Sequence, residues 1–123
     1  MNKLDCQTIR KISALKKSGV YKIYLFNKNK PIPIKRFINI DKSGLLYIGA
    51  AEKTTIYYRL NCFLNSINPS KKQNNHSAGN KIKNNEHLIK IIEENNLMFE
   101  IIRIKKEIKD YFMKYGEIPP LNG

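Results

Sequence analysis

The alternation of apolar and polar positions along the chain predicts a small β-sheet. Residues 20–26 alternate as a strand does, and residues 98–104 form a second apolar run of strand length. Residues 45–51 are apolar on both faces, so we expect this strand to lie inside the sheet. Residues 34–40 predict a short extra strand. The pattern therefore predicts about three to four strands.

Apolar residues at helical spacing predict helices over residues 4–17, from Thr54 or Thr55 to about residue 65, over 85–95 and over 105–115. The expected inward residues of the last two helices are Leu88, Ile91 and Ile92, and then Ile108, Phe112 and Tyr115. Helices and strands in this order indicate an α+β fold, with a small antiparallel or mixed sheet flanked by helices.

The remaining segments read as loops within one domain that spans residues 1–123. Residues 66–80 are the least structured by composition. Residues 27–44, inserted between two strands, are rich in lysine and turn residues and predict a hairpin. The tail after residue 115 contains two consecutive prolines, so it cannot continue the last helix. The N-terminal helix is assigned to residues 1–18.

The charge of the chain points to a polyanionic partner. Lys and Arg total 23 against 10 Asp and Glu, which gives a net charge of +13. Basic residues recur along the whole chain, as expected for a folded surface that follows phosphates, although a lysine-rich soluble surface would look the same. The expected nucleic-acid contacts are Lys22, Lys35, Arg36, Lys53, Lys71, Lys72, Lys81 and Lys83.

The two cysteines and the hydropathy of the chain indicate where in the cell we expect the protein. Cys6 and Cys62 have no metal-ligand spacing and form no disulfide framework, so we interpret both as reduced thiols. No apolar stretch approaches the length needed to cross a bilayer. The sequence therefore predicts a cytoplasmic protein that makes no contact with a membrane.

Two tripeptides lie at the start of one predicted strand and within the next. They are Gly19-Val20-Tyr21 and Tyr47-Ile48-Gly49. The pair resembles the two signature motifs of the GIY-YIG nuclease family, with Val in place of the first Ile. The resemblance implies a GIY-YIG endonuclease-like fold and hydrolysis of phosphodiester bonds in DNA.

Three further residues extend the resemblance to residues 19–122. Arg59 stands on the helix after the second motif, where the family has an arginine. Glu107 on the last helix matches the metal-binding glutamate, and Asn122 matches an asparagine that follows it. The ending Gly-Glu-Ile-Pro-Pro-Leu-Asn-Gly is similar to the closing segment of some restriction-type members.

The resemblance assigns a role to each residue. It implies one divalent ion per active site, Mg²⁺ or Mn²⁺, held by Glu107 as the sole acidic ligand. Arg59 would contact the phosphate with its fork of donors. Tyr21 and Tyr47 would share a hydrogen-bond network in which either is the general base, with a phenol pKa lowered by the nearby cation or arginine.

Some positions depart from the family pattern. Certain members have a histidine one turn after the arginine, where this chain has Phe63. His76 is similar to a loop histidine of other members, and it fits a proton shuttle, a residue that holds the tyrosine, or an exposed loop residue. Certain repair members have a lysine where this chain has Ala50; Lys53 or Lys22 would have to replace it.

The leading hypothesis is a metal-dependent DNA endonuclease. The first alternative is a nucleic-acid-binding module of the same fold with little or no catalysis, and the second is an interaction protein whose basic surface binds an acidic partner. Taken singly, each site residue also has an ordinary structural explanation. With no separate specificity domain expected, the nuclease would act as a homodimer, as a nickase or with a separate targeting partner.

Overall fold

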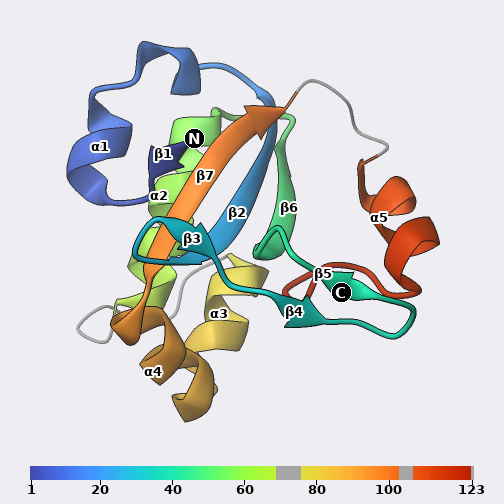
Figure 1. The fold of residues 1–123 in the computed structure, drawn as a ribbon. Coiled ribbons are helices and arrows are strands. Elements are labelled where there is room, and N and C mark those ends of the chain that lie inside the picture. The colour runs from blue at the N-terminus through green and yellow to red at the C-terminus, as the bar shows by residue number, and fades with distance from the viewer. Residues whose placement is uncertain (69–75, 103–106, 123) are drawn as a thin grey trace.

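The computed structural model describes residues 1–68, 76–102 and 107–122 (Figure 1). Its elements in chain order are β1 (Asn2–Lys3), α1 (Cys6–Arg10), a 3-10 helix (Ser13–Leu15), β2 (Gly19–Asn27), β3 (Lys30–Pro31), β4 (Ile34–Lys35), β5 (Ile40–Asp41), β6 (Leu45–Ala51), α2 (Ile56–Ile67), α3 (Ser77–Lys83), α4 (Glu86–Glu94), β7 (Asn96–Ile102) and α5 (Glu107–Tyr115).

Strand β2 is the centre of an antiparallel sheet. It pairs with β7 along one edge and with β6 along the other, while β3 pairs with its last two residues and β1 pairs with β7. The predicted α+β class is confirmed. In the described part of the chain this sheet has five strands, one or two more than expected, because β1 and β3 are only two residues long and carry too little pattern to predict.

Both faces of the sheet are covered. The side chains of Tyr21, Ile23 and Phe99 lie in a core with α1, α2, α3 and α4. Tyr24 and Ile48 lie in a second core, where Tyr111 and Tyr115 of α5 pack against them. Figure 1 shows α5 set apart from the other helices, beside β6. This double coverage explains why β6 is apolar on both faces.

Residues 45–51 form a strand as predicted, but the prediction that this strand lies inside the sheet is wrong. Among the described strands, β6 pairs with β2 alone, so β6 is an edge. The C-terminal tail covers that edge instead: Leu121 donates its N–H to the Leu46 carbonyl at 2.8 Å. Asn122 continues the cover on Ile48 with two side-chain hydrogen bonds. An irregular tail therefore replaces the expected neighbouring strand.

The single helix predicted over residues 4–17 is also wrong. Helix α1 begins after Asp5, whose side chain accepts the Thr8 N–H at 2.7 Å, and it ends at Arg10. Ile9 and Leu15 are both fully buried, yet their side chains would point about 120° apart on one regular helix. The break and the 3-10 turn allow both to reach the same core.

Residues 77–83 form helix α3, whereas we expected the whole segment 66–80 to be unstructured; residues 69–75 lie outside the described residues. The His76 side chain caps this helix by accepting the Gly79 N–H at 3.3 Å. Gly79 packs directly against Ser66 of α2. Tertiary packing therefore forms a helix from residues whose composition is typical of loops.

Two helix faces differ from the expected ones. In α4, Leu88, Ile89 and Ile92 pack on the core, while Ile91 is 41% exposed. In α5, Tyr111 is buried and Phe112 is 49% exposed. Each prediction is wrong at one residue, because nearby apolar residues allow two rotations of the helix and the sheet selects one. Across the described helices, none combines the length and apolar content that a membrane crossing requires.

The predicted strand over residues 34–40 is divided in two. The chain reverses between β4 and β5, where the Arg36 N–H donates to the Asn39 carbonyl at 2.9 Å. The strand predicted over 98–104 ends at Ile102 as β7, and the last helix begins at Glu107; residues 103–106 lie outside the described part of the chain.

Replacing Gly79 with alanine should destabilise the protein, although alanine usually favours a helix. The new methyl group would overlap Ser66 Oγ, so we expect a loss of about 1–3 kcal/mol in the free energy of unfolding, measured by urea denaturation. Ser77→Ala, at an exposed position of α3, should cost little. On a Ser66→Gly background, Gly79→Ala should cost clearly less; equal costs on both backgrounds would contradict this packing.

Candidate functional site

The pairing of β2 with β6 brings the two tripeptides together. Tyr21 lies directly opposite Gly49, and Tyr47 lies two residues before Gly49 on the same face. The ring centroids of the two tyrosines are 6.1 Å apart. A side chain at position 49 would collide with both rings. The glycine of the second motif is therefore required by the packing of the tyrosines.

His76 and Arg59 complete this group, which we call the Tyr–Arg–His cluster (Tyr21, Tyr47, Arg59 and His76). The Tyr21 hydroxyl lies 3.2 Å from His76 Nε2, and the His76 ring centroid is 5.4 Å from that of Tyr47. The positive charge of Arg59 acts on all three neighbours. Four residues predicted for the site are thus assembled from β2, β6, α2 and the residue before α3.

His76 is fully buried, which excludes the exposed loop residue considered for it. Because Gly79 N–H donates to Nδ1, the proton of the neutral ring belongs on Nε2, which then donates to the Tyr21 oxygen. Burial, with the charge of Arg59, lowers the pKa of His76 to about 4. The imidazole is therefore neutral at pH 7 and holds the Tyr21 oxygen in place.

Burial also determines the pKa of both tyrosines. It raises the pKa of the Tyr21 phenol, and the nearby Arg59 guanidinium offsets only part of this rise. The pKa of Tyr47 is raised by burial as well. The expectation that Arg59 would lower these values overall is wrong, because desolvation outweighs its charge. Tyr21 is fully buried, whereas Tyr47 and Arg59 are half-buried and can contact a bound molecule.

Asn122, predicted as a catalytic residue, contacts the backbone next to the cluster. Its side chain accepts the Ile48 N–H and donates to the Ile48 carbonyl, both at 2.8 Å. Ile48 lies between Tyr47 and Gly49. Asn122 therefore fixes the strand that carries the second motif.

Glu107 is the first residue of α5, and its side chain lies outside what the structure describes. Within residues 1–68, 76–102 and 108–122, no group of three or more His, Cys, Asp and Glu side chains is arranged to hold a metal ion. A site with one carboxylate would not produce such a group. The role of Glu107 as a metal ligand stays a prediction.

The predicted phosphate contacts differ in their surroundings. Arg36 is engaged by the tail: its guanidinium donates to the Ile118 carbonyl at 2.6 Å and lies 3.5 Å from Glu117. The other predicted phosphate contacts that the structure describes are exposed or half-buried lysines, namely Lys22, Lys35, Lys53, Lys81 and Lys83. Lys71 and Lys72 lie outside the described residues.

Sequence reasoning missed the pair that holds α5 on the sheet. Asp41 is fully buried and accepts the Tyr111 hydroxyl at 2.6 Å and the Ser43 N–H at 2.8 Å. Burial and the bond to Asp41 raise the pKa of Tyr111. Asp41 lies in an Asp-Lys-Ser-Gly turn, which predicts an exposed residue. The sequence contains no signal that pairs it with a tyrosine 70 residues later.

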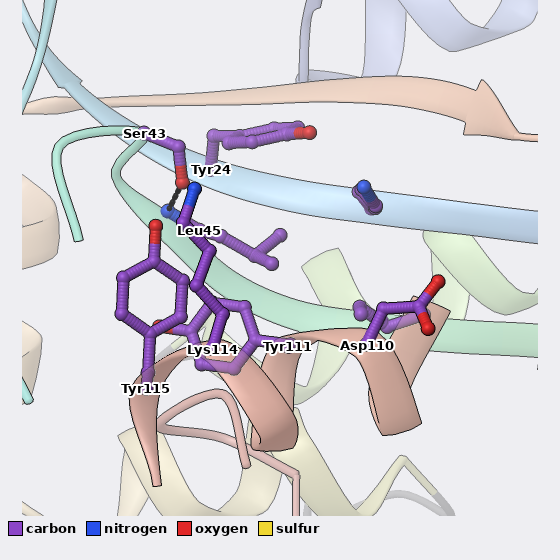
Figure 2. A pocket seen from close by; sticks show the side chains of 9 residues that line it. Tyr24, Ser43, Leu45, Asp110, Tyr111, Lys114 and Tyr115 are labelled. Carbon is purple, nitrogen blue, oxygen red and sulfur yellow. Dashed lines mark hydrogen bonds between the residues drawn. The ribbon is translucent and has the colours of Figure 1, made fainter. Parts of the chain in front are cut away.

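A cavity of about 240 Å³ lies next to this pair, on the face of the sheet opposite the Tyr–Arg–His cluster. Lys22, Tyr24 and Ser43 line it from the sheet side, and Asp110 and Lys114 line it from α5. In Figure 2, the Lys114 amino group points toward Ser43, while the Asp110 carboxylate lies at the far end.

Comparisons of this chain with protein-family models, with curated proteins and with solved structures found no match.

The buried His76 should make stability depend on pH. Between its folded pKa of about 4 and its ordinary value of 6.5, the unfolded chain binds a proton that the folded chain does not. Stability should therefore fall by about 2 kcal/mol between pH 7 and pH 4.5. Urea denaturation at several pH values would measure this. His76→Gln should flatten the profile, and parallel profiles for the two proteins would contradict the assignment.

Removing the Asn122 side chain should lower the free energy of unfolding by about 1–3 kcal/mol, because two backbone groups of Ile48 lose their partner. Asn95→Ala is a matched control, since Asn95 donates to the Ile91 carbonyl at an exposed position. Chemical denaturation of both variants would test the difference. An Asn122→Ala protein as stable as the wild type would show that this contact does not hold β6.

Proposed function

We propose that this protein is a metal-dependent DNA endonuclease of the GIY-YIG type, which hydrolyses phosphodiester bonds with one Mg²⁺ or Mn²⁺ per active site. The observation that carries the proposal is the convergence of Tyr21, Tyr47, Arg59 and His76, which lie far apart in the sequence, in one cluster. A sheet packed only for stability has no need of an arginine beside two phenols and an imidazole.

The charge of the molecule supports DNA as the substrate. A net charge of +13 draws a folded protein to phosphate backbones at ordinary salt concentration. The exposed lysines of the described residues belong to several elements, including β4, α3 and the turn before α2. Such a distribution fits a strand or duplex that extends beyond the site itself.

The geometry divides the cluster into two roles. Tyr47 and Arg59 are half-buried, so they are the members that touch the phosphate and the attacking water. The Arg59 guanidinium stabilises the negative charge that the phosphate gains as water attacks phosphorus. Tyr21 and His76 are buried positioning residues, because their hydrogen bond fixes the ring that packs beside Tyr47.

Glu107 is the residue that would hold the divalent ion. A single carboxylate suits a hard cation that keeps most of its water ligands. When bound, the ion would supply positive charge to the phosphate and its leaving oxygen. The contribution of the chain is the position of α5, which the Asp41–Tyr111 hydrogen bond sets relative to the sheet.

The proposal includes the cellular compartment and the number of copies that act together. Cys6 and Cys62 are both unpaired thiols, as suits the reducing cytoplasm, where we place the protein. Cleavage of both strands of a duplex by one small domain requires a second copy, whereas one copy would leave a nick. A separate targeting partner would serve either arrangement.

One observation favours a different function, a nucleic-acid-binding module of the same fold with little catalysis. Burial raises the pKa of both tyrosines, so neither phenol is a ready base at neutral pH. Such a module would bind DNA through its lysines and leave the backbone intact. Cleavage with a divalent ion, measured beside binding, separates the two functions.

Supercoiled plasmid should be nicked by the wild-type protein with Mg²⁺ or Mn²⁺ and remain intact with EDTA. Glu107→Ala and Arg59→Ala should each reduce the nicking rate on the order of a hundredfold or more. The first removes the carboxylate that would hold the divalent ion, and the second removes the cation that stabilises the transition state. Glu93→Ala, at an exposed position of α4, is the control for loss of an acidic side chain. DNA binding by Glu107→Ala, measured in parallel, should persist.

The endonuclease proposal is wrong if the wild type leaves the plasmid supercoiled with every ion tested while it still binds DNA. If the wild type nicks the plasmid and Glu107→Ala nicks it at the same rate, the assignment of the metal ligand is wrong.

A further inference from the structure

The hairpin formed by β4 and β5 carries apolar side chains at its tip. Phe37 is 84% exposed and Ile38 is 63% exposed. Phe37 is the most exposed large apolar residue of the described chain. One exposed apolar residue is ordinary on a protein surface, but two neighbours at the end of a projecting hairpin form a patch. Figure 1 shows this hairpin next to the C-terminal end of α5.

The tip is held by hydrogen bonds on three successive residues. Arg36 donates to the Ile118 carbonyl at 2.6 Å, and Phe37 N–H donates to the Glu117 carboxylate at 2.7 Å. Ile38 N–H donates to the Tyr115 carbonyl at 2.9 Å. The tip is therefore held by the last residue of α5 and by the segment that follows it, and the Phe37 ring remains exposed.

Gly116 allows the close approach that these bonds need. It has φ +74°, in the left-handed region, and a side chain there would meet Ile38 and Phe37. The end of α5 and the hairpin tip are therefore packed directly against each other.

The charges around the tip favour an anionic partner. Lys35, Lys42 and Lys114 are exposed on the hairpin and on α5. The two nearby carboxylates are engaged: Glu117 lies 3.5 Å from Arg36, and Asp41 is buried with its hydrogen bonds satisfied. An apolar ring on a hairpin that also carries exposed lysines is complementary to nucleic acid, which presents flat apolar faces between phosphates.

We propose that Phe37, with Ile38 beside it, inserts as a wedge between two base pairs of duplex DNA and unstacks them. Apolar side chains that enter a duplex in this way kink it, and the extra contacts offset the cost of unstacking. The choice of DNA as the partner rests on the proposed function. The chemistry of the tip fits a partner with flat aromatic faces and negative charge.

Helix α5 connects the wedge with Glu107, the proposed metal ligand. Glu107 begins this helix, and Tyr115, which anchors Ile38, ends it. At a rise of about 1.5 Å per residue, the two ends are about 12 Å apart. This distance corresponds to about three to four base-pair steps along a duplex. The unstacked step should therefore lie a few base pairs from the cut.

The absence of tryptophan in the chain makes a direct test possible. Phe37→Trp introduces a single indole at the tip, and binding of a duplex oligonucleotide in EDTA should quench its emission at least about twofold, because bases stack on it. Phe112→Trp, at an exposed position of α5, is the matched control and should change little. An unquenched Phe37→Trp protein bound to DNA overturns the proposal.

A second measurement follows the DNA. Duplexes with 2-aminopurine at successive positions should brighten at one step with the wild type, and this signal should disappear with Phe37→Ala. Phe37→Ala should also bind on the order of tenfold to a hundredfold more weakly, as expected for the loss of one stacked base. Phe112→Ala should preserve both the signal and the affinity. No brightening at any position, or brightening that Phe37→Ala retains, overturns the proposal.

The design separates this inference from the proposed activity. Both readouts are taken in EDTA, so they do not depend on cleavage. If the protein unstacks a duplex in EDTA but never cuts DNA with a divalent ion, the wedge is supported and the endonuclease proposal is wrong. If the protein nicks plasmid but does not unstack a duplex, the endonuclease proposal is supported and the wedge is wrong. If the Phe37→Trp emission changes with protein concentration without DNA, a second copy covers the tip and the wedge is excluded.

Discussion

The register between β2 and β6 is the constraint on which the rest of the structure depends. It places Tyr21 directly over Gly49, and the missing side chain at that position gives both tyrosine rings their space. A slip of one residue would turn Tyr21 to the opposite face of the sheet. The buried ring then offers its oxygen to His76, which in turn caps α3. One backbone pairing thus orders the first motif, the second motif and, through His76, helix α3.

The C-terminal third of the chain fixes what surrounds this pairing. Asn122 replaces a missing strand at the edge of β6. Asp41 holds Tyr111, and so holds α5 against the second face of the sheet. A buried carboxylate is tolerated only when its oxygens are bonded, so this contact defines one position for the helix. The same segment ties down the hairpin tip through Glu117. The proposed site and the proposed wedge therefore share one support.

Burial determines what chemistry the cluster can perform. It raises the pKa of Tyr21 and lowers that of His76, so both stay neutral at pH 7 while Arg59 carries the positive charge. A neutral and fully packed pair is suited to orienting a neighbour. The half-buried Tyr47 and Arg59 remain the members that can meet a substrate. The proposed division of labour follows from depth in the protein, since the residue types alone would permit either tyrosine or the histidine to act as the base.

The sequence by itself determined the α+β class and the existence of the strands β2, β6 and β7, because alternation of apolar and polar residues is a local signal. The residues that meet as the Tyr–Arg–His cluster were named by the resemblance of two tripeptides, an arginine and a histidine to a known family. The sequence did not predict the break after Arg10, the helix α3 or the rotation of α5 that buries Tyr111. These depend on contacts between residues far apart, such as Gly79 with Ser66 and Asp41 with Tyr111. Only the tertiary structure decides them, because competing local conformations differ by little until the core selects one.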